Sequence, residues 1–167
     1  ILNKAAYART SHNGKLLTNI LETFPRDELF QASDNYLYNT ALGILHLQEH
    51  ERVALFVRAD RFQRFFSCLV YVPRERYSTE LRYQMEEILT NTLNGTASQF
   101  YTQLGDSHLA RIHFVISTKK GKTRTFDLAK LEEHLAKVAQ SWSDRVSEIL
   151  IKKYGKKQLK ILLGYKR

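Results

Sequence analysis

Residues 52–73 read RVALFVRADRFQRFFSCLVYVP, and this stretch decides the fold. Its two apolar runs, 52–59 and 65–72, flank a polar turn at 60–63, which predicts a β-hairpin. Both runs are almost continuously apolar, so we expect central strands that are covered on both faces of a sheet. Pro73 has no N–H to donate and ends the second strand.

Elements are also predicted on the N-terminal side of this hairpin. Residues 15–24 and 34–49 carry apolar side chains at helical spacing, and Ser33 is a suitable N-cap for the second helix. Pro25 ends the first helix. Between the two helices, residues 27–31 predict a short strand.

The C-terminal side continues with a helix and two strands. The helix runs from Thr79 to about Asn94, with Ser78 or Thr79 as its cap and Gly95 as its stop. Residues 98–104 and 110–117 then predict two strands, and the second alternates cleanly between apolar and polar side chains.

The predicted fold class is α+β. The order β-α-β-β-α-β, followed by one more strand and helices, is the ferredoxin-like pattern. We expect the strand at 27–31 to lie centrally beside the strand from 65, with the strand from 110 as an extra edge strand and the helices on one face.

A long helix is predicted from Asp127 to Tyr154, followed by a short helix at 158–163. A helix of about 28 residues is about 42 Å long, twice the length of a typical strand. We therefore expect its first half, to about Val138, to pack on the sheet domain. The second half, with its stripe of Trp142, Val146 and Ile149, would meet the N-terminal helix, a partner chain or the next module, unless the helix breaks near Ser141.

These elements predict three parts: an N-terminal helical flank at 1–24, a ferredoxin-like domain at 25–118, and a basic loop with C-terminal helices at 119–167. The chain starts with Ile1, so we expect it to be an internal excerpt of a longer polypeptide.

Charge and cysteine content narrow the function classes. Residues 119–167 carry 14 Lys and Arg against 5 Asp and Glu, which accounts for the whole formal net charge of +9. Such a basic segment indicates either an anionic partner or a face turned to solvent or to a neighbouring domain, and we favour the latter. The single cysteine, Cys68, predicts a buried thiol and a reduced, cytoplasmic location. The sequence contains no run of 18 apolar residues, so it predicts no membrane-spanning helix.

The motifs predict no catalytic, cofactor-binding or metal-binding residues. The seven glycines are too far apart for a dinucleotide-binding or P-loop motif. His46, Glu49 and His50 match H-x-x-E-H, a zinc-protease pattern, but a third protein ligand is missing and a strand follows too soon for the helix to continue. We interpret these histidines as surface or helix-end residues.

A basic module that binds RNA or another polyanion, with a sheet like that of RNA-recognition domains, is the alternative function. RNA-recognition domains share the β-α-β-β-α-β order and stack bases on aromatic strand residues, and residues 64–71 occupy the corresponding strand. This stretch lacks the two glycines of the RNA-binding octamer, and residues 1–118 have no net charge. Buried core aromatics are the better interpretation.

Three stretches resemble the large NAD-specific glutamate dehydrogenases of bacteria, and the resemblance covers nearly the whole chain. They are residues 11–15 with 20–31, residues 41–49 with 55–58 and 67–74, and Ser141-Trp142 with Asp144-Arg145. In that family a long N-terminal region carries several ACT-type regulatory modules, and the catalytic domain lies further along the chain.

The resemblance implies a non-catalytic regulatory or assembly domain, the second ACT-type module with its flanking helices. It implies NAD and the oxidative deamination of glutamate to 2-oxoglutarate only for the parent enzyme. The implied partners are other domains of the same polypeptide, further copies of the chain and a small-molecule effector. Modules that bind amino acids usually have a glycine in the loop after the first strand, and the loop assigned here, residues 31–34, has none.

Overall fold

The computed structural model describes residues 7–8, 10–105, 107–119 and 125–140. Five α-helices and four strands follow in the order α1 (His12–Glu22), α2 (Arg26–Gln31), α3 (Asp34–Glu49), β1 (Ala54–Ala59), β2 (Phe65–Pro73), α4 (Thr79–Thr92), β3 (Gly95–Gln103), β4 (Leu109–Thr118) and α5 (Leu128–Val138), with a short 3₁₀ turn at Arg74–Arg76. The α+β class and the ferredoxin-like architecture are confirmed.

The sheet is antiparallel throughout, with the strand order β1-β2-β4-β3. Strands β2 and β3 run in the same direction with β4 between them, and α4 connects them, which is a split β-α-β unit. The position that the last strand of a ferredoxin-like domain occupies is filled by β1, which comes first in this chain. The order along the chain is therefore β-β-α-β-β-α.

The predicted strand at 27–31 is wrong, because these residues form α2. Pro25 precedes the first turn, and Asp27 and Glu28 lie at the helix N-terminus, where negative charge is favoured. Without that strand, the strand from 110 is not an extra edge strand: β4 lies centrally, between β2 and β3.

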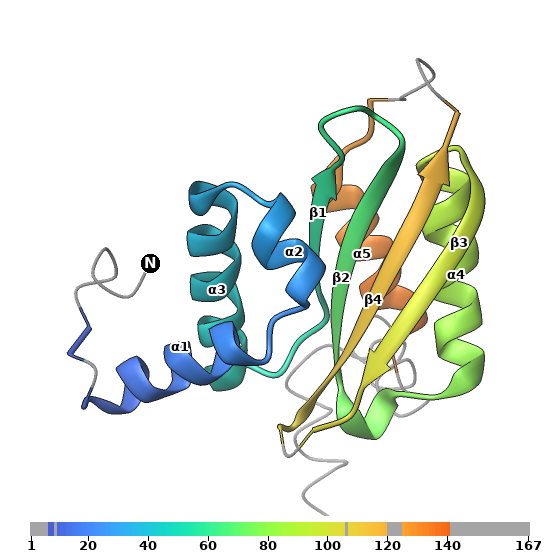
Figure 1. Cartoon of the computed structure of the whole chain (residues 1–167). Helices are drawn as coiled ribbons and strands as arrows, with labels where there is room; N and C mark the ends of the chain where they lie inside the picture. Colours follow the sequence, from blue (N-terminus) through green and yellow to red (C-terminus); the bar gives the residue numbers. More distant parts are fainter. Residues whose placement is uncertain (1–6, 9, 106, 120–124, 141–167) are drawn as a thin grey trace, which may run out of the picture.

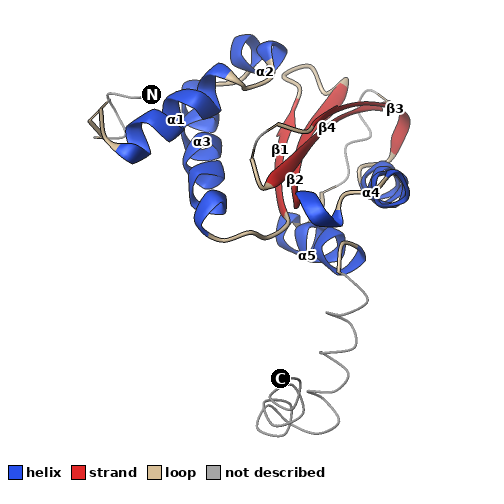
Figure 2. Cartoon of the chain, turned by 90° about the horizontal axis from the view of Figure 1, so that it is seen from below, coloured by secondary structure: helices blue, strands red, loops and turns tan. Residues whose placement is uncertain are grey.

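Helices cover both faces of the sheet, not one face as predicted (Figure 2). On one side, Met85 and Leu89 of α4 and Leu131 and Leu135 of α5 share a hydrophobic cluster with the sheet. The strand residues in that cluster are Leu55, Phe66, Cys68, Val70, Val72, Ala110, Ile112, Phe114 and Ile116. On the other side, α1 and α3 form a second cluster with β1, β2 and the start of β4.

The N-cap predictions are confirmed, but the predicted stop at Gly95 is wrong, because α4 ends at Thr92 with Leu93 as its C-cap and Gly95 begins β3. Ser33 accepts a hydrogen bond from the N–H of Tyr36, and Ser78 accepts one from the N–H of Leu81. Asp127 accepts from two N–H groups of the first turn of α5. The hairpin is also confirmed, and its turn needs a positive φ of 55° at Gln63.

The helix from Asp127 begins as predicted, and its first half packs on the domain as expected. Leu131 and Leu135 are buried against the sheet. The prediction of one continuous helix to Tyr154 is wrong, because α5 ends at Val138, with Ala139 as its C-cap. The predictions for residues 141–167, including Trp142, Val146, Ile149 and the short helix, lie outside the described residues. The domain limits at residues 25 and 118 stay a prediction.

Within the described ranges, none of the helices has the length and apolar character needed to cross a bilayer.

Candidate functional site at the helix–sheet junction

The site lies where α1, α2 and α3 meet the sheet, a surface that we call the junction (Figure 1). Leu17, Ile20 and Ile44 from the helices pack with Leu69 and Tyr71 of β2 in one buried cluster. Gly43 allows this close approach, because a Cβ at this position would lie 2.7 Å from the ring of Phe56 on β1. Phe56 in turn packs edge-on against Tyr71.

A buried ion pair fastens α2 to the sheet. Arg58 of β1 donates from Nε and Nη2 to the two carboxylate oxygens of Glu28, at 2.8 and 2.7 Å. The side chains are only 10% and 3% exposed. Burial alone would raise the pKa of Glu28, but hydrogen bonds from Arg58 and Ser67 and the charge of Arg58 outweigh it, so this pKa lies below its ordinary value.

Two further polar side chains, Ser67 and His113, lie beside the Glu28–Arg58 pair and form a buried polar cluster with it. Ser67 Oγ and His113 Nε2 are hydrogen-bonded at 2.8 Å, and the same nitrogen lies 4.0 Å from Glu28 Oε1. Burial lowers the pKa of His113, although the charge of Glu28 acts in the opposite direction. His113 is therefore neutral at pH 7.

Ser67, His113 and Glu28 do not have the geometry of a catalytic triad. In a triad the acid holds the histidine nitrogen that faces away from the serine. Here the carboxylate approaches the nitrogen that the serine already uses, and Ser67 is fully buried. This cluster can hold α2 on the sheet, but it has no route for a substrate to reach the hydroxyl.

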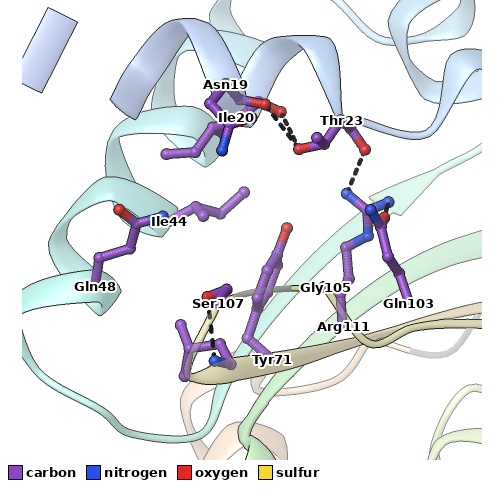
Figure 3. Close-up of a pocket in the computed structure, with 11 residues that line it drawn as sticks. Asn19, Ile20, Thr23, Ile44, Gln48, Tyr71, Gln103, Gly105, Ser107 and Arg111 are labelled. Carbon is purple, nitrogen blue, oxygen red and sulfur yellow. Dashed lines mark hydrogen bonds between the residues drawn. The ribbon is translucent and has the colours of Figure 1, made fainter. Parts of the chain in front are cut away.

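A cavity of about 290 Å³ opens at the other end of the junction (Figure 3). The helices contribute Asn19, Ile20, Thr23, Ile44 and Gln48 to its wall. The strands and the β3–β4 turn contribute Tyr71, Gln103, Gly105, Ser107, Leu109 and Arg111. Both sides of the junction therefore build one concave, partly apolar surface with several hydrogen-bonding groups, which is the usual composition of a small-molecule site.

Arg111 is the charged residue of this wall. Its Nη1 donates to the carbonyl oxygen of Thr23 at 2.8 Å, and its Nη2 donates to Gln103 Oε1. It also lines a neighbouring hollow, where Asp27 and His113 lie. Sequence patterns could not single out Arg111, since its partners come from α1 and β3.

The histidines of the H-x-x-E-H pattern are not brought together with a third ligand. Helix α3 ends at Glu49 and His50 is its C-cap, so the helix does stop where the sequence predicted. Across the parts of the chain that the structure describes, no three His, Cys, Asp or Glu side chains gather closely enough to hold a metal ion.

Residues 64–71 do not form an open platform for bases. Phe66, Cys68 and Val70 point into the cluster under α4 and α5, while Leu69 and Tyr71 lie under α1 and α3. Cys68 is buried as predicted, and burial raises the pKa of its thiol.

The sequence assigns residues 31–34 to the loop after the first strand, where modules that bind amino acids usually have a glycine. This assignment is wrong. These residues join α2 to α3, and Ser33 is the N-cap of α3. In the split β-α-β unit the corresponding loop follows β2, at residues 74–78, and it contains no glycine either.

Two family models match the two sides of the junction. Residues 1–50 match the model described as glutamate dehydrogenase, helical motif 1. Residues 54–143 match the model described as glutamate dehydrogenase, ACT2 domain. The boundary between the two matches falls where α3 ends and β1 begins, so the junction described above is the contact between the two matched units.

Three curated relatives share the name NAD-specific glutamate dehydrogenase. The chain is 42% identical over 164 residues to that of Halomonas elongata, a match that covers 98% of this chain and 10% of the relative. It is 35% identical to that of Pseudomonas aeruginosa, over 93% of this chain and 10% of the relative. It is 34% identical to that of Mycobacterium tuberculosis, over 81% of this chain and 9% of the relative. The chain spans about a tenth of the length of these relatives.

Proposed function

Because the chain belongs to the glutamate dehydrogenase family, as a helical motif followed by an ACT-type domain, we propose that it is a non-catalytic regulatory and assembly domain of that enzyme. The parent enzyme would oxidatively deaminate L-glutamate to 2-oxoglutarate with NAD, and its NAD site would lie elsewhere in the polypeptide. Catalytic, cofactor-binding and metal-binding residues are not assigned to this part.

The observation that carries this proposal is the junction. The Glu28–Arg58 pair and the cluster around Tyr71 join the helical motif and the ACT-type sheet into one body. A body built from two units can transmit a change at their contact to whatever each unit touches. The partners that we propose are other domains of the same polypeptide and further copies of the chain, in the cytoplasm.

The non-catalytic part of the proposal is tested by incubating purified residues 1–167 with L-glutamate and NAD while following NADH fluorescence. We expect no NADH above the protein-free background, with the full-length parent enzyme as the positive control. Steady production of NADH by this chain would refute the proposal.

The regulatory part is tested in the full-length parent enzyme with Arg58→Met. This substitution leaves Glu28 buried without its partner, so we expect a changed oligomeric state or a changed glutamate saturation curve. Arg61→Met, on the exposed hairpin turn, is the matched control and should behave as wild type. If both variants match the wild type in assembly and in kinetics, the junction has no regulatory role.

A further inference from the structure

The described wall of the cavity at the junction carries a positive charge. Among the described residues of its wall, Arg111 alone is charged, and no Asp or Glu side chain takes part. Thr23, Gln103 and Tyr71, to which Arg111 is hydrogen-bonded, are all neutral. The acidic side chain of Asp27 lines the neighbouring hollow instead.

Arg111 retains donors for a ligand. A guanidinium group carries five N–H donors in a planar fork that matches a carboxylate. The bonds to Thr23 and Gln103 use two of these donors, and a hydrogen bond to Tyr71 uses a third, which leaves two for a ligand. These bonds also fix the side chain in place, so a ligand would meet a group that is already oriented.

Neutral donors surround this cation. The hydroxyl of Tyr71 points into the cavity in Figure 3, and burial raises its pKa, so it stays protonated and able to donate. Ser107 Oγ accepts from the N–H of Leu109 at 3.1 Å, which leaves its O–H to donate. The amides of Asn19 and Gln48 come from the two helices.

The remaining wall is apolar, with Ile20, Ile44 and Leu109. The volume of about 290 Å³ lies at the lower limit of drug-sized sites, so it suits a smaller ligand. A compact phosphate would leave the apolar wall unused and would find one arginine, whereas a short carbon chain would cover that wall.

We propose that this cavity binds a small carboxylate that lacks an ammonium group, such as a 2-oxo acid or a short dicarboxylic acid. Arg111 holds one carboxylate, the hydroxyls and amides bind the other oxygens, and the carbon chain lies on the isoleucines. An α-amino acid is disfavoured because its ammonium group finds no carboxylate among the described residues of this wall and is repelled by Arg111. The proposal gives an effector class to the regulatory role above and rests on it.

The ligand touches both units, so it binds the joined form and stabilises it by mass action. Separation of the helical motif from the sheet would remove half of the wall. Occupancy of the cavity therefore reports on, and strengthens, the contact between the two units.

The test is calorimetric titration of residues 1–167 with 2-oxoglutarate, glutarate and L-glutamate. The first and third share a carbon skeleton and differ at C2, where one has a carbonyl and the other an ammonium group. We expect 2-oxoglutarate and glutarate to bind, and L-glutamate to bind at least about tenfold more weakly. Arg111→Gln should abolish binding, while Arg61→Gln, on the exposed hairpin turn, should retain it.

Gln48→Trp is the second variant, because an indole ring would fill the cavity without removing Arg111. If circular dichroism shows that Arg111→Gln is unfolded, Gln48→Trp tests whether the ligand binds in this cavity. Equal or tighter binding of L-glutamate, binding that survives Gln48→Trp, or no binding of any of the three at millimolar concentrations would each overturn the proposal. These outcomes leave the regulatory role standing, whereas wild-type assembly and kinetics of the parent enzyme with Arg58→Met would refute that role independently.

Discussion

At the scale of single residues, the Glu28–Arg58 pair is a buried polar contact between α2 and the sheet. Two hydrogen bonds join side chains that are almost fully buried. Breaking such a pair lowers the free energy of unfolding far more than breaking an exposed pair does, because the remaining charge stays buried without a partner. The pair should therefore dominate the response of this fold to acid.

Glu28→Gln tests this response. The pKa of Glu28 is lowered in the folded chain from an ordinary value of 4.5, so its ionised form stabilises the fold above that pH. This stabilisation is lost as the pH falls through the folded pKa. We expect the variant to lose roughly 3 kcal/mol at pH 7 and the difference from wild type to shrink towards zero in strong acid.

Urea unfolding at several pH values measures this difference. Glu49→Gln, at an exposed position at the end of α3, is the control and should track the wild type at each pH. A Glu28→Gln deficit that stays constant down to strong acid would mean that the carboxylate charge does not contribute.

At the scale of elements, α5 closes one edge of the sheet. Edge strand β1 has an outward N–H at Leu55, and Glu132 of α5 accepts from it at 2.9 Å. The other oxygen of Glu132 lies 3.1 Å from Arg52. The opposite edge strand, β3, carries exposed side chains such as Tyr101, which is 62% exposed. The two edges therefore differ in how they are protected.

Glu132→Ala should weaken this edge. The substitution leaves the N–H of Leu55 without its acceptor, and we expect a loss of about 1 kcal/mol in unfolding free energy. Hydrogen exchange at the Leu55 amide should accelerate as well. Glu133→Ala removes the neighbouring carboxylate, which faces solvent and pairs with Lys137, and should change neither quantity. Equal exchange in both variants would show that α5 does not protect β1.

Most elements were predictable from the sequence, because their information is local. The hairpin at 52–73, the caps Ser33, Ser78 and Asp127 and the apolar stripe of α3 each depend on residues that are close together in the sequence. Residues 26–31 were not predicted correctly, since a six-residue segment shows too little periodicity to separate helix from strand.

The candidate site was beyond sequence reasoning for a different reason. Glu28 meets Arg58 across 30 residues, and Arg111 meets Thr23 across 88. Neither of these separations along the sequence corresponds to a motif with fixed spacing. Placing them side by side requires the strand order and the position of α2, and the strand predicted at 27–31 gave both incorrectly.

At the scale of the whole molecule, the sheet lies between two hydrophobic clusters and contributes side chains to both. Leu69 and Tyr71 of β2 belong to the cluster with α1 and α3, and Cys68 and Val70 belong to the cluster with α4 and α5. Removal of the N-terminal helices would expose one whole side of β1 and β2. The ACT-type unit therefore needs its helical motif as a cover.

A chain of residues 51–167 tests this dependence. We expect it to bind the dye ANS strongly and to self-associate, since the side chains that faced α1 and α3 become accessible to water. A chain of residues 7–167 keeps every helix of that cluster and is the control. A monomeric, ANS-negative fragment that melts like the full chain would show that the two units are independent.

The shared cluster also has a consequence during synthesis on the ribosome. Helices α1–α3 are complete once residue 49 has been translated, yet their cluster is closed only by Leu69, Tyr71 and finally Leu109. Translation adds about 5–20 residues per second, so the apolar side of the new helices waits uncovered for several seconds. During that interval the nascent chain exposes an apolar surface of the kind that makes folding intermediates prone to aggregate and dependent on chaperones.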